Sequence, residues 1–237
     1  MVMESETKRL IHDWLPTNCE RLLDAGCSWG DDTAFFQTKC KEVFGIDLNP
    51  IYIKKAERIH PGINFTNCGI EQTPFNTSFF DVVILSEVIE HVSDEHKALN
   101  EVYRILRKDG WLILTTPHKG MFKFLDPGSY KYYINKIISP LSDIFINATK
   151  HRHYSLNDIQ KLLNDSNWRE GYKIERIQRG GLFAGVVLNN IRVILKKMLG
   201  ERVSRFIVKP FYFIAHWDNI INYGPLSYEM ALLIQKI

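Results

Sequence analysis

Short apolar segments alternate with segments of helical character along the first half of the chain. The apolar runs, which are typical of buried strands, cover residues 21–25, 43–47, 63–68, 81–85 and 111–116. Between them, residues 49–59 and 94–106 have a helical period. Strands that are apolar throughout and separated by helices indicate an α/β fold, in which helices cover both faces of a parallel sheet.

The direction of the predicted strands decides where a ligand binds. Right-handed crossovers place the carboxyl ends of parallel strands at the same edge of the sheet. We therefore expect the functional side chains in the loops that follow these strands.

The regular alternation ends after Thr116. Residues 118–150 are rich in Lys, Phe and Tyr without a clear period, and we interpret them as an insertion. Further along, the pattern predicts helices at residues 155–163 and 182–199, and strands at residues 172–178 and 227–237. The hypothesis is a single domain over residues 1–237, made of a ligand-binding half (1–117), the insertion, and a carboxyl-terminal half (151–237) with an amphipathic lid at 180–217.

The composition is that of an ordinary globular protein. Of 237 residues, 45% are hydrophobic and 24% are charged, and 30 Lys and Arg against 27 Asp and Glu leave a formal charge of +3. No apolar run approaches the ~20 residues that cross a bilayer, and the first residues are too polar for a signal peptide. We therefore expect a cytoplasmic protein.

The four cysteines support the same compartment. Cys19, Cys27, Cys40 and Cys68 all lie in the first third of the chain and have no Cys-x-x-Cys spacing. This pattern favours reduced thiols over a disulfide scaffold or a zinc ribbon.

The first predicted strand leads into a turn of small residues. The stretch from Leu22 to Gly30 reads Leu-Leu-Asp-Ala-Gly-Cys-Ser-Trp-Gly, and a helix begins near Asp31. Small residues let the backbone approach a ligand closely. Asp47 ends the second strand, where its carboxylate can accept hydrogen bonds from two ribose hydroxyls. A glycine turn alone is a weak signal, but together with Asp47 it predicts a nucleoside pocket.

The residues after the turn favour a cationic ligand over a phosphate. In the dinucleotide fingerprint Gly-x-Gly-x-x-Gly, the amides at the start of the helix face a pyrophosphate. Here Ser28 replaces the middle glycine, and the carboxylates of Asp31 and Asp32 repel phosphate. S-adenosylmethionine carries a sulfonium and an amino group instead of phosphates, so the sequence favours this cofactor over NAD.

Five stretches carry a resemblance to a known family. They are residues 22–30, 45–47, 73–83, 87–92 and 106–111. In this order the chain resembles the class I S-adenosylmethionine-dependent methyltransferases, especially the branch of the ubiquinone and menaquinone methyltransferases. A weaker match at residues 153–163 resembles the helix before the sixth strand of that family.

The resemblance implies a fold and a binding site. The fold is a doubly wound, Rossmann-like sheet of seven strands with the last strand antiparallel, helices on both faces, and an inserted and carboxyl-terminal helical lid. The cofactor S-adenosylmethionine lies across the carboxyl ends of the first four strands. Residues assigned to it are Asp24, Gly26, Cys27, Ser28, Gly30, Asp47, Leu48, Gly69, Ile70, Ser86 and Glu87.

Two positions depart from the family pattern. Ser28 stands where Gly is usual, and Gly69 stands where an Asp often contacts adenine, so we expect weakened cofactor affinity from the second change. Two alternatives also stay open: Asp24 caps the turn, and Asp47 hydrogen-bonds its own loop.

Methyl transfer to a hydroxyl requires positioning and removal of a proton. The candidate catalytic residues are Glu87, His91 and His118. The alternative for the two histidines is a purely structural role. A further alternative starts a helix at Glu87, so that Glu87, Glu90 and a later histidine bind a divalent ion, as in RNA 2′-O-methyltransferases. The main hypothesis uses no metal.

The carboxyl-terminal third is the predicted acceptor region. Residues 176–217 include eight basic residues and one acidic residue, and the apolar positions at 183–199 follow helical spacing. Such a helix can lie on an anionic membrane or cover a lipid-like acceptor, the alternative being an ordinary solvated lid. A charge of only +3 and a sequence pI of about 8.6 argue against nucleic acid.

The sequence thus predicts a cytoplasmic, S-adenosylmethionine-dependent enzyme that methylates a small, hydrophobic or lipid-like acceptor, at oxygen, and contacts the inner membrane face through residues 180–217. Two alternatives remain, a metal-assisted RNA 2′-O-methyltransferase and a noncatalytic binding module with the same fold.

Overall fold

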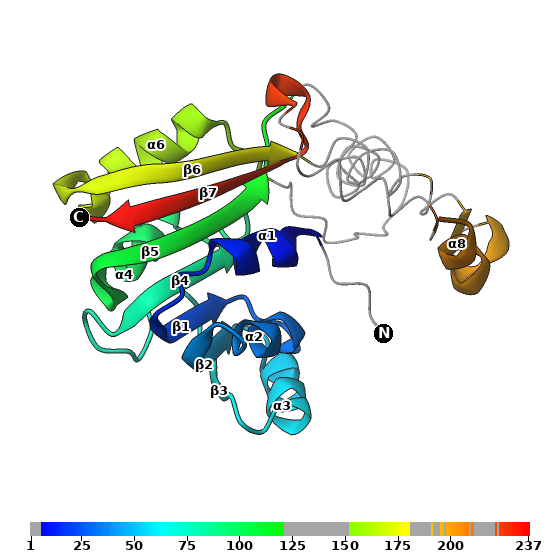
Figure 1. Ribbon diagram of the computed structural model, residues 1–237, viewed down its shortest axis with the longest axis horizontal. Helices are drawn as coiled ribbons and strands as arrows, with labels where there is room; N and C mark the ends of the chain where they lie inside the picture. The colour runs from blue at the N-terminus through cyan, green and yellow to red at the C-terminus, as the bar shows by residue number, and fades with distance from the viewer. Residues whose placement is uncertain are drawn as a thin grey trace, which may run out of the picture. The chain divides into compact units, whose positions relative to one another are not determined.

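The described strands form one mixed β-sheet (Figure 1). The computed structural model describes residues 6–120, 152–180, 191, 195–196, 198–208, 210, 221 and 223–237. Their strands are β1 (Cys19–Ala25), β2 (Cys40–Asp47), β3 (Asn64–Asn67), β4 (Phe80–Ser86), β5 (Leu106–Pro117), β6 (Tyr172–Gly180) and β7 (Glu229–Lys236). The sheet that these residues form has seven strands in the order β3-β2-β1-β4-β5-β7-β6.

The sheet is parallel except for one strand. β1 pairs in parallel with β2 and β4, β2 with β3, and β4 with β5. β7, drawn in red in Figure 1, runs opposite to its neighbours β5 and β6. The predicted Rossmann-like sheet with an antiparallel last strand is therefore confirmed.

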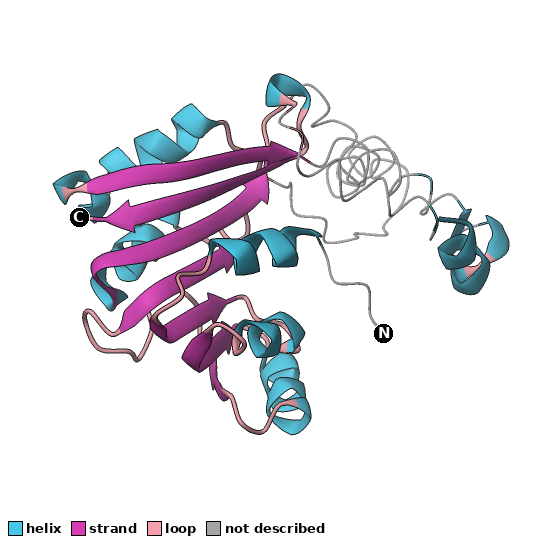
Figure 2. Ribbon diagram, in the orientation of Figure 1, coloured by secondary structure: helices cyan, strands magenta, loops and turns pink. Residues whose placement is uncertain are grey.

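Helices lie on both faces of the sheet, as predicted (Figure 2). They are α1 (Glu6–Trp14), α2 (Asp31–Phe36), α3 (Pro50–Ile59), α4 (Glu95–Ile105) and α6 (Leu156–Asn164). The described residues also form α8 (Glu201–Val208) and short 3-10 helices at Asn167–Glu170 and Gly224–Leu226. Ile11 of α1 and Phe36 of α2 belong to one core cluster with residues of β1, β2, β4 and β5. Elsewhere, the fully buried Trp168 donates its indole N–H to the carbonyl oxygen of Leu99 in α4 at 2.8 Å.

Local signals explain the elements that carry the site. β4 is buried along its length up to Ser86 because it lies between β1 and β5 in the sheet. The Asn49 side chain accepts a hydrogen bond from Ile51 N at 2.9 Å, and Pro50 follows in the first turn of α3. Asp94 caps α4 by accepting from Lys97 N at 3.0 Å.

Some elements differ from the sequence prediction. The pattern did not predict α1. Ile11 within this helix and Leu15, which directly follows it, are buried in the core with 2% and 4% exposure. β5 begins directly after α4 at Leu106, not at residue 111. The predicted helix at 182–199 falls mostly outside the described residues, as do residues 121–150 of the insertion; residues 191, 195–196 and 198–199 are helical.

The contacts divide the chain into two compact units. The first consists of residues 1–116, 156–177 and 231–237, and the second of residues 117–155 and 178–230. No helix of the described segments is long and apolar enough to cross a membrane.

The cysteine prediction was wrong for one pair. Cys19 and Cys40 form a disulfide between the amino ends of β1 and β2. The parallel register places them directly opposite each other, with Cα atoms 4.6 Å apart, within the range that a disulfide spans. Cys27 and Cys68 are free thiols, as predicted.

Candidate functional site

The turn after β1 is held by the next strand. Gly26 has a φ of 79°, and the N–H groups of Gly26 and Cys27 both donate to the carbonyl oxygen of Ile46, at 2.8 and 3.0 Å. A Cβ on Gly26 would lie 2.5 Å from Val88 Cγ2. The bend therefore requires glycine for its backbone conformation and for its space.

The other small residues of the turn have different roles. Ser28 also has a positive φ, 49°, and its N–H donates to Asp47 Oδ2 at 3.0 Å. Gly30 precedes α2 with a φ of 79°, and a Cβ there would lie 2.5 Å from Cζ of Phe65. Gly30 thus allows the approach of the Phe65 ring.

Asp24 is a buried carboxyl group at the end of β1. Its side chain is 5% exposed, and Oδ2 accepts a hydrogen bond from Thr33 Oγ1 at 2.6 Å. Burial raises the pKa of Asp24 to about 7, against the opposing effect of the Thr33 hydrogen bond; the charges of Asp32 and Asp47 raise the pKa further, and Lys8 lowers it. Asp24 therefore exchanges a proton near neutral pH, and a cation placed beside it would favour the charged form.

Asp47, at the end of β2, connects two loops. Its Oδ2 accepts from Ser28 N at 3.0 Å and its Oδ1 from Asn49 N at 2.8 Å. These bonds fit the alternative that Asp47 holds its own loop. They do not consume the carboxylate, because each oxygen can accept a second hydrogen bond.

Two cavities open at this edge of the first unit and share Gly26. The first has a volume of about 250 Å³. Its lining includes acidic and small residues at the ends of β1 and β4, together with side chains of α1 and α2. The lining residues are Lys8, Ile11, Asp24, Gly26, Cys27, Ser28, Trp29, Asp31, Asp32, Phe36 and Ser86.

The second cavity has a volume of about 280 Å³. Apolar side chains line much of it, together with the carboxyls of Asp47, Glu71 and Glu87 and the imidazole of His91. The lining residues are Gly26, Ile46, Asp47, Leu48, Cys68, Gly69, Ile70, Glu71, Glu87, Val88, His91 and Val92. Leu48 packs close to Gly69, because a Cβ on Gly69 would lie 3.0 Å from Leu48 Cδ2. Of the residues predicted to bind the cofactor, all except Gly30 line one cavity or the other.

Glu87 follows β4 in a left-handed conformation, with a φ of 56°. Its N–H donates to the carbonyl oxygen of Thr115 at 3.1 Å, and Thr115 Oγ1 donates to Glu87 Oε1 at 3.2 Å. The hydroxyls of Ser86 and Thr115 are 3.1 Å apart. Such a backbone conformation is costly for a residue with a side chain, so the contacts to β5 keep Glu87 in place at the cavity.

His91 lines the second cavity, but the residues before it do not start a helix. Residues 89–91 form a turn closed by a hydrogen bond from His91 N to Val88 O at 2.9 Å. Glu87 is exposed, whereas Glu90 is 3% exposed and accepts from Thr116 Oγ1 at 3.3 Å. The helical face proposed for a metal is therefore wrong. In the described part of the chain, no group of three or more His, Cys, Asp or Glu residues is arranged to hold a metal ion.

His118 belongs to the second unit, where it is 7% exposed. Its Nδ1 lies 3.3 Å from the carbonyl oxygen and 3.1 Å from Oγ of Ser227. Since a carbonyl oxygen only accepts, that contact places a proton on Nδ1 and leaves Nε2 as an acceptor. Burial lowers the pKa of His118, so the neutral imidazole is favoured. Its catalytic role stays a prediction.

The sequence analysis missed several cavity residues. Lys8 comes from α1, and Val88 and Cys68 contribute to the second cavity. The spacing of Ile11 and Leu15 is a helical signal that could have revealed α1. Nothing in a local pattern shows that Lys8 reaches the turn after β1.

The chain is similar in sequence to known methyltransferases. Residues 23–114 match the family described as methyltransferase domain. Among curated relatives, the malonyl-[acyl-carrier protein] O-methyltransferase of Serratia marcescens is 27% identical over 147 residues, 60% of this chain and 57% of that protein. The ubiquinone/menaquinone biosynthesis C-methyltransferase UbiE of Pasteurella multocida is 26% identical over 183 residues, 70% of this chain and 66% of that protein.

A solved structure has the same fold. The geranyl diphosphate C-methyltransferase of Streptomyces coelicolor, crystallised with Mg²⁺, geranyl diphosphate and S-adenosyl-L-homocysteine, is 16% identical and superposes with a TM-score of 0.63 over 99% of this chain and 77% of that chain. The predicted resemblance to the S-adenosylmethionine-dependent methyltransferases is confirmed, with residues 23–114 as the matched domain. The chain spans about 60% of the length of the curated relatives it matches.

Proposed function

We propose that this protein uses S-adenosylmethionine to methylate a small, apolar or lipid-like acceptor, at oxygen. The observation that carries the proposal is the pair of cavities that meet at Gly26, one lined by carboxyl groups and one largely apolar. A ligand with a charged end and a flat apolar end matches this division. S-adenosylmethionine has an amino-acid end, an adenine ring, and a ribose between them.

The second cavity suits the adenosine portion. Leu48 and Ile70 supply apolar surface for the ring, and the Asp47 carboxylate supplies acceptors for the ribose hydroxyls. Leu48 occupies the space beside Gly69, so an Asp at position 69 would require Leu48 to move. Backbone groups and the apolar wall would then bind adenine here.

The first cavity suits the cationic portion. The carboxyls of Asp24, Asp31 and Asp32 favour a sulfonium and an ammonium, and they oppose a pyrophosphate. Gly26 lines this cavity, and a larger residue there would collide with Val88. When bound, S-adenosylmethionine supplies an electrophilic methyl group.

The protein's own contribution to transfer is positioning and proton removal. Ser86 lines the first cavity, and Glu87 and His91 line the second, so these side chains are candidates to orient an acceptor hydroxyl and take its proton. The relatives include a malonyl-[acyl-carrier protein] O-methyltransferase and a ubiquinone/menaquinone biosynthesis C-methyltransferase. We choose oxygen because the exposed Glu87 carboxylate and the His91 imidazole both line the second cavity, where either can accept a proton from a hydroxyl.

Calorimetric titration with S-adenosylhomocysteine tests the cofactor, and the methyl-labelled cofactor tests the transfer. We expect saturable binding, and a labelled product whose ¹³C NMR signal is that of a methoxy carbon. A carbon-bound methyl signal would contradict the choice of oxygen and leave the methyltransferase in place. Absence of binding at millimolar S-adenosylhomocysteine would exclude the enzyme and leave the alternative of a noncatalytic binding module with the same fold.

A further inference from the structure

We infer that Lys8 binds the carboxylate of the ligand's amino-acid end and so makes the first cavity selective for adenosyl amino acids over adenosyl amines. The inference rests on the proposed function and adds a specificity-determining residue to it. Among the described residues that line this cavity, Lys8 is the one with a cationic side chain, and three aspartates line the same cavity.

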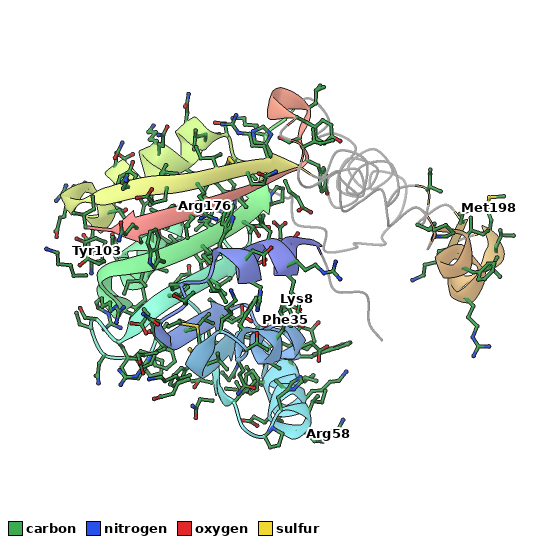
Figure 3. All side chains as sticks on the ribbon, in the orientation of Figure 1. Lys8, Phe35, Arg58, Tyr103, Arg176 and Met198 are labelled. Carbon is green, nitrogen blue, oxygen red and sulfur yellow. A yellow bond between two sulfur atoms is a disulfide. The ribbon has the colours of Figure 1, made fainter. Side chains whose placement is uncertain are left out.

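Lys8 is held in place before any ligand binds. Its side chain is 11% exposed, and Nζ lies 3.1 Å from Asp32 Oδ1. Nζ also lies 4.5 Å from the centre of the Phe35 ring, and Figure 3 shows the two labelled side chains beside each other. A side chain that is already ordered loses little entropy when it binds a ligand, so its hydrogen bond contributes more to affinity.

The helix that carries Lys8 is fixed to the sheet. Ile11 lies one turn after Lys8 on α1 and is buried in the core cluster with Phe36 of α2. Asp32 lies in the first turn of α2. The distance between the Lys8 ammonium and the turn after β1 is therefore set by packing.

The charges of the cavity match a zwitterion. An α-amino acid has an ammonium and a carboxylate on one carbon, and the cavity offers carboxyl groups beside one ammonium. Lys8 Nζ lies 3.1 Å from Asp32 Oδ1 and donates to the carbonyl oxygen of Asp31 at 3.5 Å. An ammonium nitrogen has three N–H donors, so Lys8 can keep its pair with Asp32 and exchange or add a hydrogen bond to a ligand carboxylate. A ligand without the carboxylate would give Lys8 no acceptor, although its ammonium would still lie beside the aspartate carboxyls.

The test compares two ligands that differ in one group. S-adenosylhomocysteine has the carboxylate, and 5′-(3-aminopropylthio)-5′-deoxyadenosine is the same molecule without it. For Lys8→Met we expect calorimetric affinity for S-adenosylhomocysteine to fall about tenfold or more, and affinity for the amine to change less than about twofold or to rise. Lys8→Arg should show at most about two thirds of the affinity loss seen in Lys8→Met, because its charge and its N–H donors remain.

The matched control is Lys41→Met, which removes a different lysine ion pair. Lys41 Nζ lies 2.7 Å from Glu20 Oε1, and neither residue lines a cavity. It should change neither affinity. Amine binding by Lys8→Met also shows that the variant is folded. Equal weakening for both ligands, or none for S-adenosylhomocysteine, would overturn the role of Lys8 and leave the proposed function standing. Failure of the unmodified protein to bind either ligand would overturn both.

Discussion

Asp24 and Asp47 end neighbouring strands, yet their surroundings give them different properties. Asp24 is buried and bonded to Thr33, and its pKa is raised to about 7. Asp47 is partly exposed and accepts two backbone N–H groups from the loops beside it. We therefore expect Asp24 to respond to pH and to ligand charge, and Asp47 to supply fixed acceptors.

Asp47→Ala should weaken the binding of S-adenosylhomocysteine at least about tenfold, because charge-assisted hydrogen bonds worth ~1.5 to 3 kcal/mol are lost. Calorimetric titration measures the change. Asp47→Asn keeps one acceptor oxygen for the loops and should lose less. Asp165→Ala, on an exposed residue after α6, is the control with unchanged affinity. If Asp47→Ala binds as tightly as the control, Asp47 does not contact the ribose.

Affinity for S-adenosylhomocysteine should rise as the pH rises through about 7, because the ligand ammonium favours the ionised Asp24 carboxylate. Binding should release a proton in this range, which calorimetry in buffers of different ionisation enthalpy detects. In Asp24→Asn, which can still accept from Thr33, the rise and the proton release should disappear. A rise that persists in Asp24→Asn would assign the titration to another group.

The same pKa sets the sign of a stability effect. The folded value of about 7 lies above the ordinary value of 3.8, so on raising the pH the unfolded chain loses this proton first. The contribution of Asp24 to stability is therefore fully present below about pH 4 and is lost as the pH rises to about 7. Relative to the unmodified protein, Asp24→Asn should gain in melting temperature over this interval.

At the scale of elements, β1 and β2 are joined at both ends by different means. The Cys19–Cys40 disulfide joins their amino ends. Bonds from Gly26 and Cys27 to Ile46, and from Ser28 to Asp47, join their carboxyl ends. The first connection serves stability, and the second shapes the cavities.

Reduction of the disulfide should lower the free energy of unfolding by ~3 kcal/mol, because the closed loop between Cys19 and Cys40 no longer restricts the unfolded chain. Urea unfolding with and without a phosphine reductant measures the change. The double variant Cys19→Ala, Cys40→Ala should not respond to the reductant, and the reduced protein should still bind S-adenosylhomocysteine. An unchanged urea midpoint in the unmodified protein would show that the bond does not form in solution.

At the scale of the whole molecule, both cavities belong entirely to the first compact unit. The predicted lid, residues 180–217, belongs to the second. Within that unit, Arg179 O accepts from Tyr223 N at 3.3 Å and Gly180 O from Tyr228 N at 3.0 Å. The ends of the segment between β6 and β7 thus lie close enough for a short replacement.

Replacing residues 181–222 with a short Gly-Ser linker should leave affinity for S-adenosylhomocysteine within about twofold and lower methyl transfer to the acceptor at least about tenfold. The first expectation follows from the cavity linings, and the second from the predicted acceptor region. Calorimetry and the labelled-methyl assay measure the two quantities. Full transfer activity in the shortened protein would place the acceptor site elsewhere.

The sequence by itself determined the alternation of strands and helices from β1 onward and the residues at the carboxyl ends of β1 and β2. Apolar runs, a turn of small residues and the acids Asp24 and Asp47 are local patterns, and local patterns fix local backbone and the direction of strands. The family resemblance extended these to the residues of β4 and its loop.

Only the tertiary structure decided which distant residues meet. Strand register paired Cys19 with Cys40, helix packing brought Lys8 to the first cavity, and Leu48 occupied the space beside Gly69. Contacts to β5 also hold Glu87 in a turn, where the metal alternative required the start of a helix. These features depend on contacts between residues far apart along the chain, and periodicity carries no information about such contacts.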